Sequence, residues 1–358
     1  MSNLPLWAYP IILVASIALS MVFTPLALRI ALDHNILDHP GPAKAHTRAV
    51  PYLGGAAIAL AFAVAVVVAA LLRPPSSGIG QLVVIMLLSL TLATAGLIDD
   101  LRGLPIWFRL LLEAGTGAAL WAMGISTHLA GLSSPVDAVV TIIFVVIVTN
   151  AFNLLDNMDG LSAGVAAITS LGIFGIAAYH GEFLVASLAI ALAGCAAGFL
   201  RHNFHPASIY MGDAGSLFLG FLIATLSLKL RDTPATRVDM AALVALLWIA
   251  LLDTALVVVT RVLNKTSPFQ GGQDHTSHRL VKLGLPVKGA VGVIYAATAA
   301  WAGVGVYLSI IAGGSGGLGG VGGVGGVGGV GIGTIALISE AVGGIVFIAL
   351  LGLIRVQR

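Results

Sequence analysis

Oxygen-bearing side chains collect beside the ends of long apolar runs at three places in this chain. The candidates are Asp99, Asp100, Asn153, Asp156, Asp159 and Asp213. Adjacent carboxylates at a membrane boundary repel each other unless a cation or a shared proton compensates them. The three-residue spacing from Asn153 to Asp156 and on to Asp159 would place neighbouring members on one helix face. Such ligands suit Mg²⁺ or Mn²⁺, although solvated helix ends and a helix cap at Asp213 are plainer alternatives.

Basic and histidine side chains occur in two further segments that suit contact with phosphate oxygens. The segments read KAHTR, which begins with Lys44, and DHTSHR, which contains His275, His278 and Arg279. Membrane topology alone could account for the lysine and arginines, but it does not require the histidines. The histidine pair could instead bind zinc, although the single cysteine and the absence of an HExxH pattern disfavour that interpretation.

The elements that carry these residues must be membrane spans. Of the 358 residues, 58% are hydrophobic and 9% are charged, whereas a soluble domain is about 25% charged, so a water-soluble globular fold is excluded. The apolar runs are continuous rather than alternating, which favours helices over a barrel. We predict an all-α polytopic membrane protein with about eleven transmembrane helices, at 6–30, 52–72, 80–98, 106–123, 136–152, 160–179, 183–200, 212–230, 240–262, 289–311 and 333–354.

The distribution of positive charge orients these spans. With the N-terminus outside, thirteen Lys and Arg residues fall on the cytosolic side and four outside, as the positive-inside rule requires. An odd number of spans places the C-terminus in the cytosol, and all the polar motifs then lie on the cytosolic side. We expect one integral-membrane domain over 1–358. Its glycine-rich segment 313–333 is predicted to be an external loop, because each interior glycine costs a helix roughly 1 kcal/mol.

Charged residues inside the spans need separate interpretation. Asp253 lies about ten residues before Arg261 in one span, hence roughly 12–15 Å into the membrane at 1.5 Å per residue. An intramembrane carboxylate is a functional candidate, and a hydrogen-bonded acid facing another helix is the alternative. Arg109 and Glu113 are four residues apart on one helix and are most simply an internal ion pair. We assign that pair no chemistry.

Oxygen ligands for a divalent metal, basic residues for phosphate and a surrounding lipid phase together indicate transfer of a phosphoryl-linked group from a soluble nucleotide to a lipid. Positioning and charge neutralisation supply most of the catalysis in such reactions. The chain has no GxxxxGK[ST] motif, which argues against ATP-driven transport. A secondary transporter or lipid flippase is the alternative class, in which Asp253 and the external basic cluster at 229–237 would belong to a transport route. No nucleic-acid partner is expected.

Five motifs resemble, in order and in separation, those of the polyprenyl-phosphate N-acetylhexosamine-1-phosphate transferases. These enzymes are glycosyltransferases of family 4. They read KAHTRAVPYLGG, IDDLRGLP, NAFNLLDNMDGL, NFHPASIYMGDAGSLFLG and DHTSHR. The resemblance runs through nearly the whole chain. It implies a UDP-N-acetylhexosamine donor, a polyprenyl phosphate acceptor and Mg²⁺, with UMP and a polyprenyl-diphosphate sugar as products. It also implies a multi-pass protein of the inner (plasma) membrane that initiates cell-envelope glycan synthesis at the cytosolic face. The chain could form a homodimer.

The resemblance also implies roles for individual residues. Asp213 and Asn153 would be metal ligands, and Asp99 and Asp100 would lie near the reacting phosphates. Asp99 is the candidate for accepting a proton from the attacking lipid phosphate or for orienting it. The uridine portion would be held by Asn203, Tyr210, Asp156 and Asp159. Tyr210 would either stack on uracil or serve as an interfacial aromatic. The diphosphate or sugar would be held by Lys44, His275, His278 and Arg279.

Two motifs bear on the identity of the donor sugar. The phospho-N-acetylmuramoyl-pentapeptide transferases are similar throughout, but they carry consecutive histidines where this chain reads DHTSHR. The chain is therefore more similar to the N-acetylglucosamine-1-phosphate transferases that begin surface-glycan synthesis. Asn157 gives DNMDG where many relatives have DGxDG, which leaves the precise sugar open. A phospho-N-acetylmuramoyl-pentapeptide transferase is the alternative within the family.

Overall fold

The computed structural model describes residues 6–39, 49–75, 78–129, 134–231, 240–269, 271–314 and 344. These residues form long helices with little other regular structure. The long helices are α1 (Ala8–Asp33), α2 (Gly54–Leu72), α3 (Ile79–Arg102), α4 (Ile106–Ala122), α5 (Ser134–Leu155), α6 (Leu161–Tyr179), α7 (Phe183–Asn203), α8 (Gly212–Lys229), α9 (Met240–Leu263) and α11 (Val287–Gly314). The short elements are β1 (Leu37–Asp38), β2 (Val50–Pro51) and α10 (Thr276–Lys282).

The prediction of an all-α polytopic membrane protein is confirmed. In the described part of the chain, 9 helices are long and apolar enough to cross a membrane. Helix α4 has 17 residues, which is the lower end of the spanning range of about 17–25. Ten of the eleven predicted spans coincide with α1–α9 and α11. The predicted span 333–354 lies outside the described residues apart from Gly344, as does the predicted loop 313–333 beyond Gly314.

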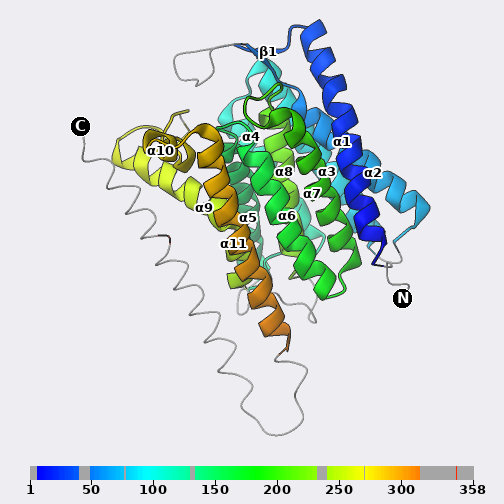
Figure 1. Ribbon diagram of the computed structural model, residues 1–358. Helices are drawn as coiled ribbons and strands as arrows, with labels where there is room; N and C mark the ends of the chain where they lie inside the picture. Colours follow the sequence, from blue (N-terminus) through cyan, green and yellow to red (C-terminus); the bar gives the residue numbers. More distant parts are fainter. Residues whose placement is uncertain are drawn as a thin grey trace, which may run out of the picture.

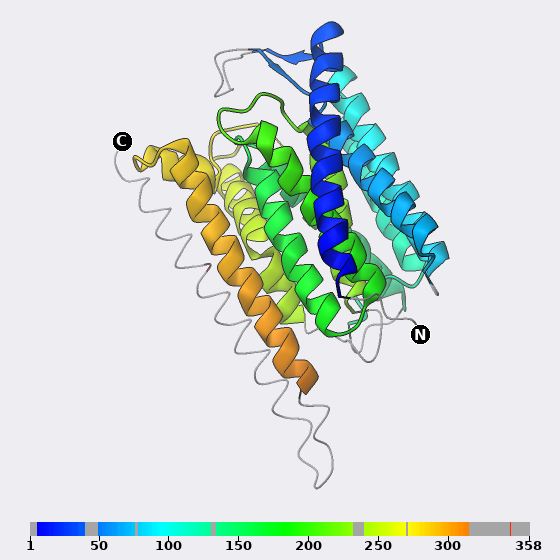
Figure 2. The same ribbon diagram turned by 45° about the vertical axis from the view of Figure 1, so that its right-hand side comes forward.

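Successive long helices run in opposite directions, so the chain returns repeatedly to the same end of the bundle. The antiparallel strands β1 and β2 pair at that end, and α10 lies there too (Figure 1). Figure 2 shows the same arrangement from a second direction. The motifs that contain the predicted site residues sit at the ends of α3, α5, α7 and α9 and at the start of α8. The topology therefore brings them to one surface of the bundle.

Helix α8 forms the centre of the bundle and is buried along nearly its whole length. Glycines allow its neighbours to approach closely. A Cβ on Gly220 would lie 2.7 Å from the carbonyl oxygen of Thr149 on α5. A Cβ on Gly55 at the start of α2 would overlap the backbone of Gly215 on α8. These contacts fix where α8 begins, and hence where Asp213 lies.

The contact between α2 and α8 gives a stability prediction. Replacing Gly55 by Ala should destabilise the protein by roughly 1–3 kcal/mol, because the added Cβ forces the two helices apart. Thermal unfolding in detergent should show a lower Tm. Gly303→Ala on α11 is the matched control, since a Cβ there meets no atom within 4 Å. Equal Tm values for the two variants would contradict the packing described.

Two helix ends differ from the sequence prediction. Helix α3 continues to Arg102 and stops at Gly103, whose φ is 68°, so Asp99 and Asp100 are helical residues. Helix α5 stops at Leu155, and Asp156 and Asp159 lie in the turn before α6. The prediction that they share a helix face with Asn153 was wrong. Gly160, with φ 77°, supplies the left-handed conformation that ends this turn and starts α6.

Candidate active site

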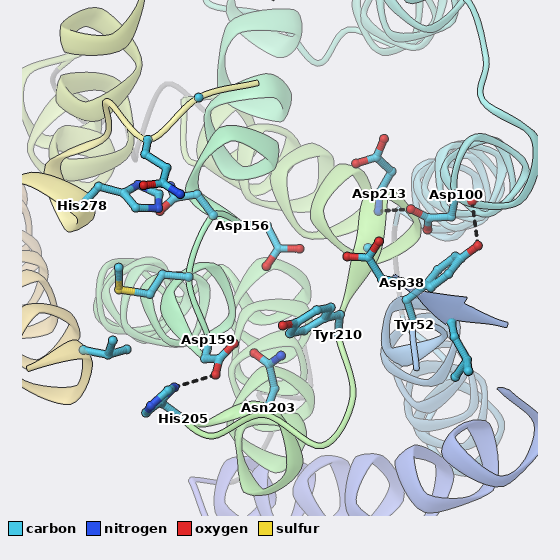
Figure 3. Close-up of a pocket in the computed structure, with 17 residues that line it drawn as sticks. Asp38, Tyr52, Asp100, Asp156, Asp159, Asn203, His205, Tyr210, Asp213 and His278 are labelled. Carbon is cyan, nitrogen blue, oxygen red and sulfur yellow. Dashed lines mark hydrogen bonds and ion pairs between the residues drawn. The ribbon is translucent and has the colours of Figure 1, made fainter. Parts of the chain in front are cut away.

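A cavity of about 580 Å³ opens at the polar end of the bundle. Its volume falls within the range of about 300–1,000 Å³ that ligand pockets occupy. Figure 3 shows acidic, amide and aromatic side chains from separate segments pointing into it. The lining residues are Leu37, Asp38, Tyr52, Asp100, Asp156, Asn157, Met158, Asp159, Asn203, His205, Tyr210, Gly212, Asp213, Gly272, Gln273, His278 and Val287. Seven of the predicted site residues therefore line one cavity: Asp100, Asp156, Asp159, Asn203, Tyr210, Asp213 and His278.

Asp100 joins the end of α3 to the start of α8. Its carboxylate accepts hydrogen bonds from the backbone N–H groups of Asp213, at 2.8 Å, and Ala214, at 3.1 Å. This contact satisfies donors that the first turn of α8 would otherwise leave unpaired. The hydroxyl of Tyr52 donates to the Asp100 carbonyl at 2.9 Å (Figure 3). Asp100 therefore positions Asp213, which it contacts through the backbone.

Asp213 is the meeting point of three elements. Its Oδ1 accepts a hydrogen bond from Asn153 Nδ2 on α5 at 2.7 Å. Its Oδ2 lies 2.9 Å from Arg109 Nη1 on α4, and the same nitrogen lies 3.0 Å from Asp99 Oδ2. The structure thus brings together the four residues that the sequence placed around one cation: Asp99, Asp100, Asn153 and Asp213.

The sequence analysis did not predict that Arg109 belongs to this site. Its Nε does lie 3.9 Å from Glu113 Oε1, as an internal pair requires, but its short contacts are to Asp99 and Asp213. Glu113 is fully buried and also accepts a hydrogen bond from Asn150. Its position in the sequence could have indicated this role. Arg109 lies in the first turn of an apolar helix that begins shortly after Asp99 and Asp100, where a cation could compensate the two carboxylates.

The turn between α5 and α6 holds two more carboxylates. Burial, reinforced by the nearby carboxylates of Asp213, Asp100 and Asp159, raises the pKa of Asp156 to about 8. Asp159 is fixed by the loop after α7, because its Oδ2 lies 2.7 Å from His205 Nδ1 and accepts the Ala207 N–H at 3.0 Å. His205 was not among the predicted residues. The crowding of carboxylates in this part of the cavity therefore favours the neutral form of Asp156.

Asn203 and Tyr210 shape the loop between α7 and α8. Asn203 is 2% exposed, accepts the Gly160 N–H at 3.0 Å and donates to the Ile209 carbonyl at 2.9 Å. Its amide therefore positions the loop, although the residue also borders the cavity. Tyr210 is held by its backbone N–H, which donates to the Pro51 carbonyl at 2.8 Å. Burial, with Asp159 nearby, raises the pKa of Tyr210 to about 12, so the phenol stays neutral.

Asp253 holds the loop that contains His275 and His278, called here the histidine loop. Of the two interpretations of Asp253 from sequence, the structure supports the hydrogen-bonded acid. Its carboxylate lies 2.8 Å from His275 Nδ1 and accepts the Thr276 N–H at 2.7 Å. His275 is 3% exposed and does not line the cavity. Arg279 donates to the Asp274 carbonyl and to Thr260 Oγ1, both at 2.9 Å, so it also lies behind the cavity wall. Lys44 lies outside the described residues.

Asn157 makes a further contact with this loop. Its Oδ1 accepts a hydrogen bond from Ser277 Oγ, and its Nδ2 donates to the Leu154 carbonyl at 2.7 Å. Asn157 therefore ties the turn after α5 to α10. Both residues that flank this link, Met158 and His278, line the cavity.

His278 gives a prediction about pH. Burial, with His275 close by, lowers the pKa of His278 to about 4, whereas an unfolded histidine has a pKa of about 6.5. Between these values the unfolded chain binds a proton that the folded chain does not, so the free energy of unfolding falls as the pH drops through this window. Between pH 7 and pH 5 the Tm of the wild type should therefore decrease relative to that of His278→Gln, which lacks this contribution; the raised pKa of Asp156 acts in the opposite direction, but it does so in both proteins. A difference in Tm that stays constant over this range would contradict the assignment.

The fold and the cavity together define an integral-membrane protein with an acidic cavity at one end of its helical bundle. Comparison with known proteins shows which class of enzyme it is. Residues 82–231 match the sequence model of glycosyl transferase family 4. A probable undecaprenyl-phosphate N-acetylglucosaminyl 1-phosphate transferase of Bacillus subtilis (strain 168) is 30% identical over 297 residues, which cover 79% of this chain and 80% of the relative. The chain belongs to glycosyl transferase family 4.

Two other relatives represent different members of the family. A decaprenyl-phosphate N-acetylglucosaminephosphotransferase of Mycolicibacterium smegmatis is 30% identical over 310 residues, covering 77% of this chain and 75% of the relative. A phospho-N-acetylmuramoyl-pentapeptide-transferase of Geobacillus kaustophilus is 32% identical over 235 residues, covering 59% of this chain and 71% of the relative. The similarity to the first type therefore extends over more of the chain.

Proposed function

We propose that this enzyme transfers N-acetylglucosamine 1-phosphate from UDP-N-acetylglucosamine to a polyprenyl phosphate. A phosphate oxygen of the lipid attacks the phosphorus that bears the sugar, and the bond from that phosphorus to the oxygen it shares with the uridine phosphate breaks. The products are a polyprenyl-diphosphate sugar and UMP. The observation that supports this most strongly is the convergence of Asp99, Asp100, Asn153, Asp213 and Arg109 beside one cavity in an otherwise apolar bundle.

The residues present fit a magnesium ion bound together with substrate. Within the described residues, no three His, Cys, Asp or Glu side chains form a metal site of their own. Mg²⁺ is usually held by one or two carboxylates plus substrate phosphates, so a complete protein cage is not required. Asp213 and Asn153 would hold the ion, with the Asn153 amide turned to present its oxygen, and Mn²⁺ could replace Mg²⁺. The ion would neutralise the charge of the diphosphate.

The chain's own residues would then bind and orient the two substrates. Arg109 offers a guanidinium beside Asp213, where a phosphate oxygen must lie. Tyr210 presents a neutral ring on which uracil could stack, a contact that contributes roughly 1–3 kcal/mol. Asp156 and Asp159 would accept hydrogen bonds from the uridine portion. The second pKa of a phosphate monoester is about 6, so the lipid phosphate is already largely ionised at neutral pH. Asp99 therefore need only orient this nucleophile.

We further propose that the site faces the cytosol across the inner membrane, where the product would begin a cell-envelope glycan. The excess of basic residues on that side supports this orientation. Lys229 and Arg231, which depart from the rule, have structural partners: Lys229 Nζ donates to Gln81 Oε1 at 2.8 Å, and Arg231 Nε donates to the Thr127 carbonyl at 2.6 Å. Asp253 is likewise bonded to the histidine loop, so structural contacts account for these three residues without a transport route.

The test is product formation by the purified full chain in detergent. With UDP-N-acetylglucosamine, undecaprenyl phosphate and Mg²⁺, UMP should appear together with a lipid-soluble sugar, and EDTA should stop both. The muramoyl-pentapeptide nucleotide should compete weakly. Stronger use of that nucleotide would assign the chain to the pentapeptide transferases instead. Solute movement across sealed vesicles without UMP release would support a transporter and would contradict the proposal.

A further inference from the structure

Arg109 lies between carboxylates on two sides that compete for its guanidinium. On one side, its Nη1 lies 3.0 Å from Asp99 Oδ2 and 2.9 Å from Asp213 Oδ2. On the other side, its Nε lies 3.9 Å from Oε1 of Glu113, four residues further along α4. That nitrogen is buried without a hydrogen-bond partner among the described residues, and so is Glu113 Oε1. An unused donor and an unused acceptor therefore lie beyond hydrogen-bonding distance of each other.

The two sides of this guanidinium have the same construction, a carboxylate with an amide partner from α5. Asn153 Nδ2 donates to Asp213 Oδ1 at 2.7 Å. Three residues earlier on α5, Asn150 Nδ2 donates to Glu113 Oε2. The same nitrogen of Asn150 donates to the Val146 carbonyl at 2.9 Å, which fixes the second pair to the backbone of α5. The cation is therefore flanked by two positions in which a carboxylate is already oriented.

The position at Glu113 needs a cation because it is deeply buried. Glu113 is fully buried, and a charged group there is costly unless a counter-charge and hydrogen bonds compensate it. Its Oε2 has the Asn150 amide, whereas its Oε1 has no partner within the described part of the chain. Hydrogen bonds from arginine to a carboxylate are about 2.7–2.9 Å long. A shift of the guanidinium by roughly 1 Å would therefore complete this pair.

A metal ion held by Asp213 must share that carboxylate with Arg109. Like charges that contact the same carboxylate repel each other, so metal binding favours movement of the guanidinium away from Asp213. We propose that Glu113 is a positioning residue that receives the guanidinium of Arg109 when Mg²⁺ binds at Asp213. This inference rests on the proposed function, which supplies the metal. The shift would release Nη1 of Arg109 from the carboxylates and offer it to a substrate phosphate.

The first test measures metal binding without either substrate. Binding of Mn²⁺ to the purified full chain in detergent is followed by the EPR signal of the free ion. If the guanidinium lies with Glu113 in about 10% of molecules before metal binds, Arg109→Met should lower the Kd for Mn²⁺ about tenfold, because no cation has to be displaced. Glu113→Gln should raise the Kd several-fold, because the guanidinium then lacks its second partner.

The double variant separates this role from a simple effect of charge. In the Arg109→Met background, Glu113→Gln should change the Kd for Mn²⁺ less than about twofold, because no guanidinium remains to be received. Equal weakening in both backgrounds would show that Glu113 acts only through its own negative charge and would overturn the proposal. Asp33→Asn removes an exposed carboxylate at the end of α1, and this matched control should leave the Kd unchanged.

A second measurement observes the guanidinium itself and does not depend on the folding of a Glu113 variant. In ¹⁵N-arginine-labelled protein, the Nε–H signal of Arg109 is identified by its loss in Arg109→Lys. Saturating Mg²⁺ should move this signal downfield, because Nε then donates to a carboxylate. An unchanged signal would overturn the proposal, even if UMP is released and the proposed reaction stands. If the signal moves but no UMP is released, the proposed reaction fails while the role of Glu113 stands.

Discussion

Replacing Asp213 by Asn should reduce turnover about 10²- to 10³-fold, the range found when one electrostatic contact to a reacting group is removed. The carboxylate contacts α4 and α5 and the backbone N–H contacts α3, and the carboxylate is the proposed ligand for Mg²⁺. An amide of the same shape keeps the packing but removes the charge. UMP release in detergent with saturating substrates measures the effect.

The stability of this variant distinguishes lost chemistry from lost folding. Asp213 lies among the carboxylates of Asp99, Asp100 and Asp156, so removing its charge relieves repulsion. The Tm of Asp213→Asn should therefore equal or exceed that of the wild type in the absence of Mg²⁺. Asp33→Asn, at an exposed carboxylate at the end of α1, is the matched control and should change neither quantity. Activity within a few-fold of the wild type in Asp213→Asn would contradict the proposed role.

Replacing Arg109 by Met should have the second largest effect, on both turnover and stability. The guanidinium contacts Asp99, Asp213 and, at longer range, the fully buried Glu113. Removing the cation leaves carboxylates unpaired, which costs about 3 kcal/mol for a largely buried group. Turnover should fall about 10²-fold, because a phosphate contact is lost as well. UMP release and Tm are the two readouts.

A second substitution separates these two effects. Adding Glu113→Gln to Arg109→Met removes the buried charge that lost its cation, so part of the lost Tm should return while turnover stays low. Arg109→Lys keeps the charge, but its single ammonium cannot contact Asp99 and Asp213 through one nitrogen while a second nitrogen faces Glu113. This variant should retain more stability than activity. Recovery of turnover in the double variant would show that Arg109 acts only through folding.

Much of the fold could be predicted because membrane helices are visible in the sequence as continuous apolar runs. Ten predicted spans match helices within a few residues. The ends were less predictable, since apolarity ceases at Ile98 while α3 continues until the left-handed Gly103. That difference matters for the site, because it makes Asp99 and Asp100 part of a helix. The short α10 was missed, since seven residues carry no periodic signal.

The gathering of Asp99, Asp100, Asn153 and Asp213 followed from alternating helix direction, which returns every second loop to one surface. Which side chains face the cavity depends on contacts that spacing does not reveal. His275 and His278 lie three residues apart, yet Asp253 takes the first of them away from the cavity. Arg109 has a local partner at i+4, and only the fold shows that Asp213, 104 residues away, is closer.

The most direct measurement follows the phosphorus that is claimed to move. UDP-N-acetylglucosamine carrying ³²P next to the sugar and ¹⁴C in the uracil should be incubated with the purified chain, undecaprenyl phosphate and Mg²⁺. The account predicts that ³²P enters the lipid phase in equal amount to the ¹⁴C-UMP released into water. Release of UDP, with the sugar reaching lipid without its phosphorus, or retention of both labels in intact nucleotide, would contradict it.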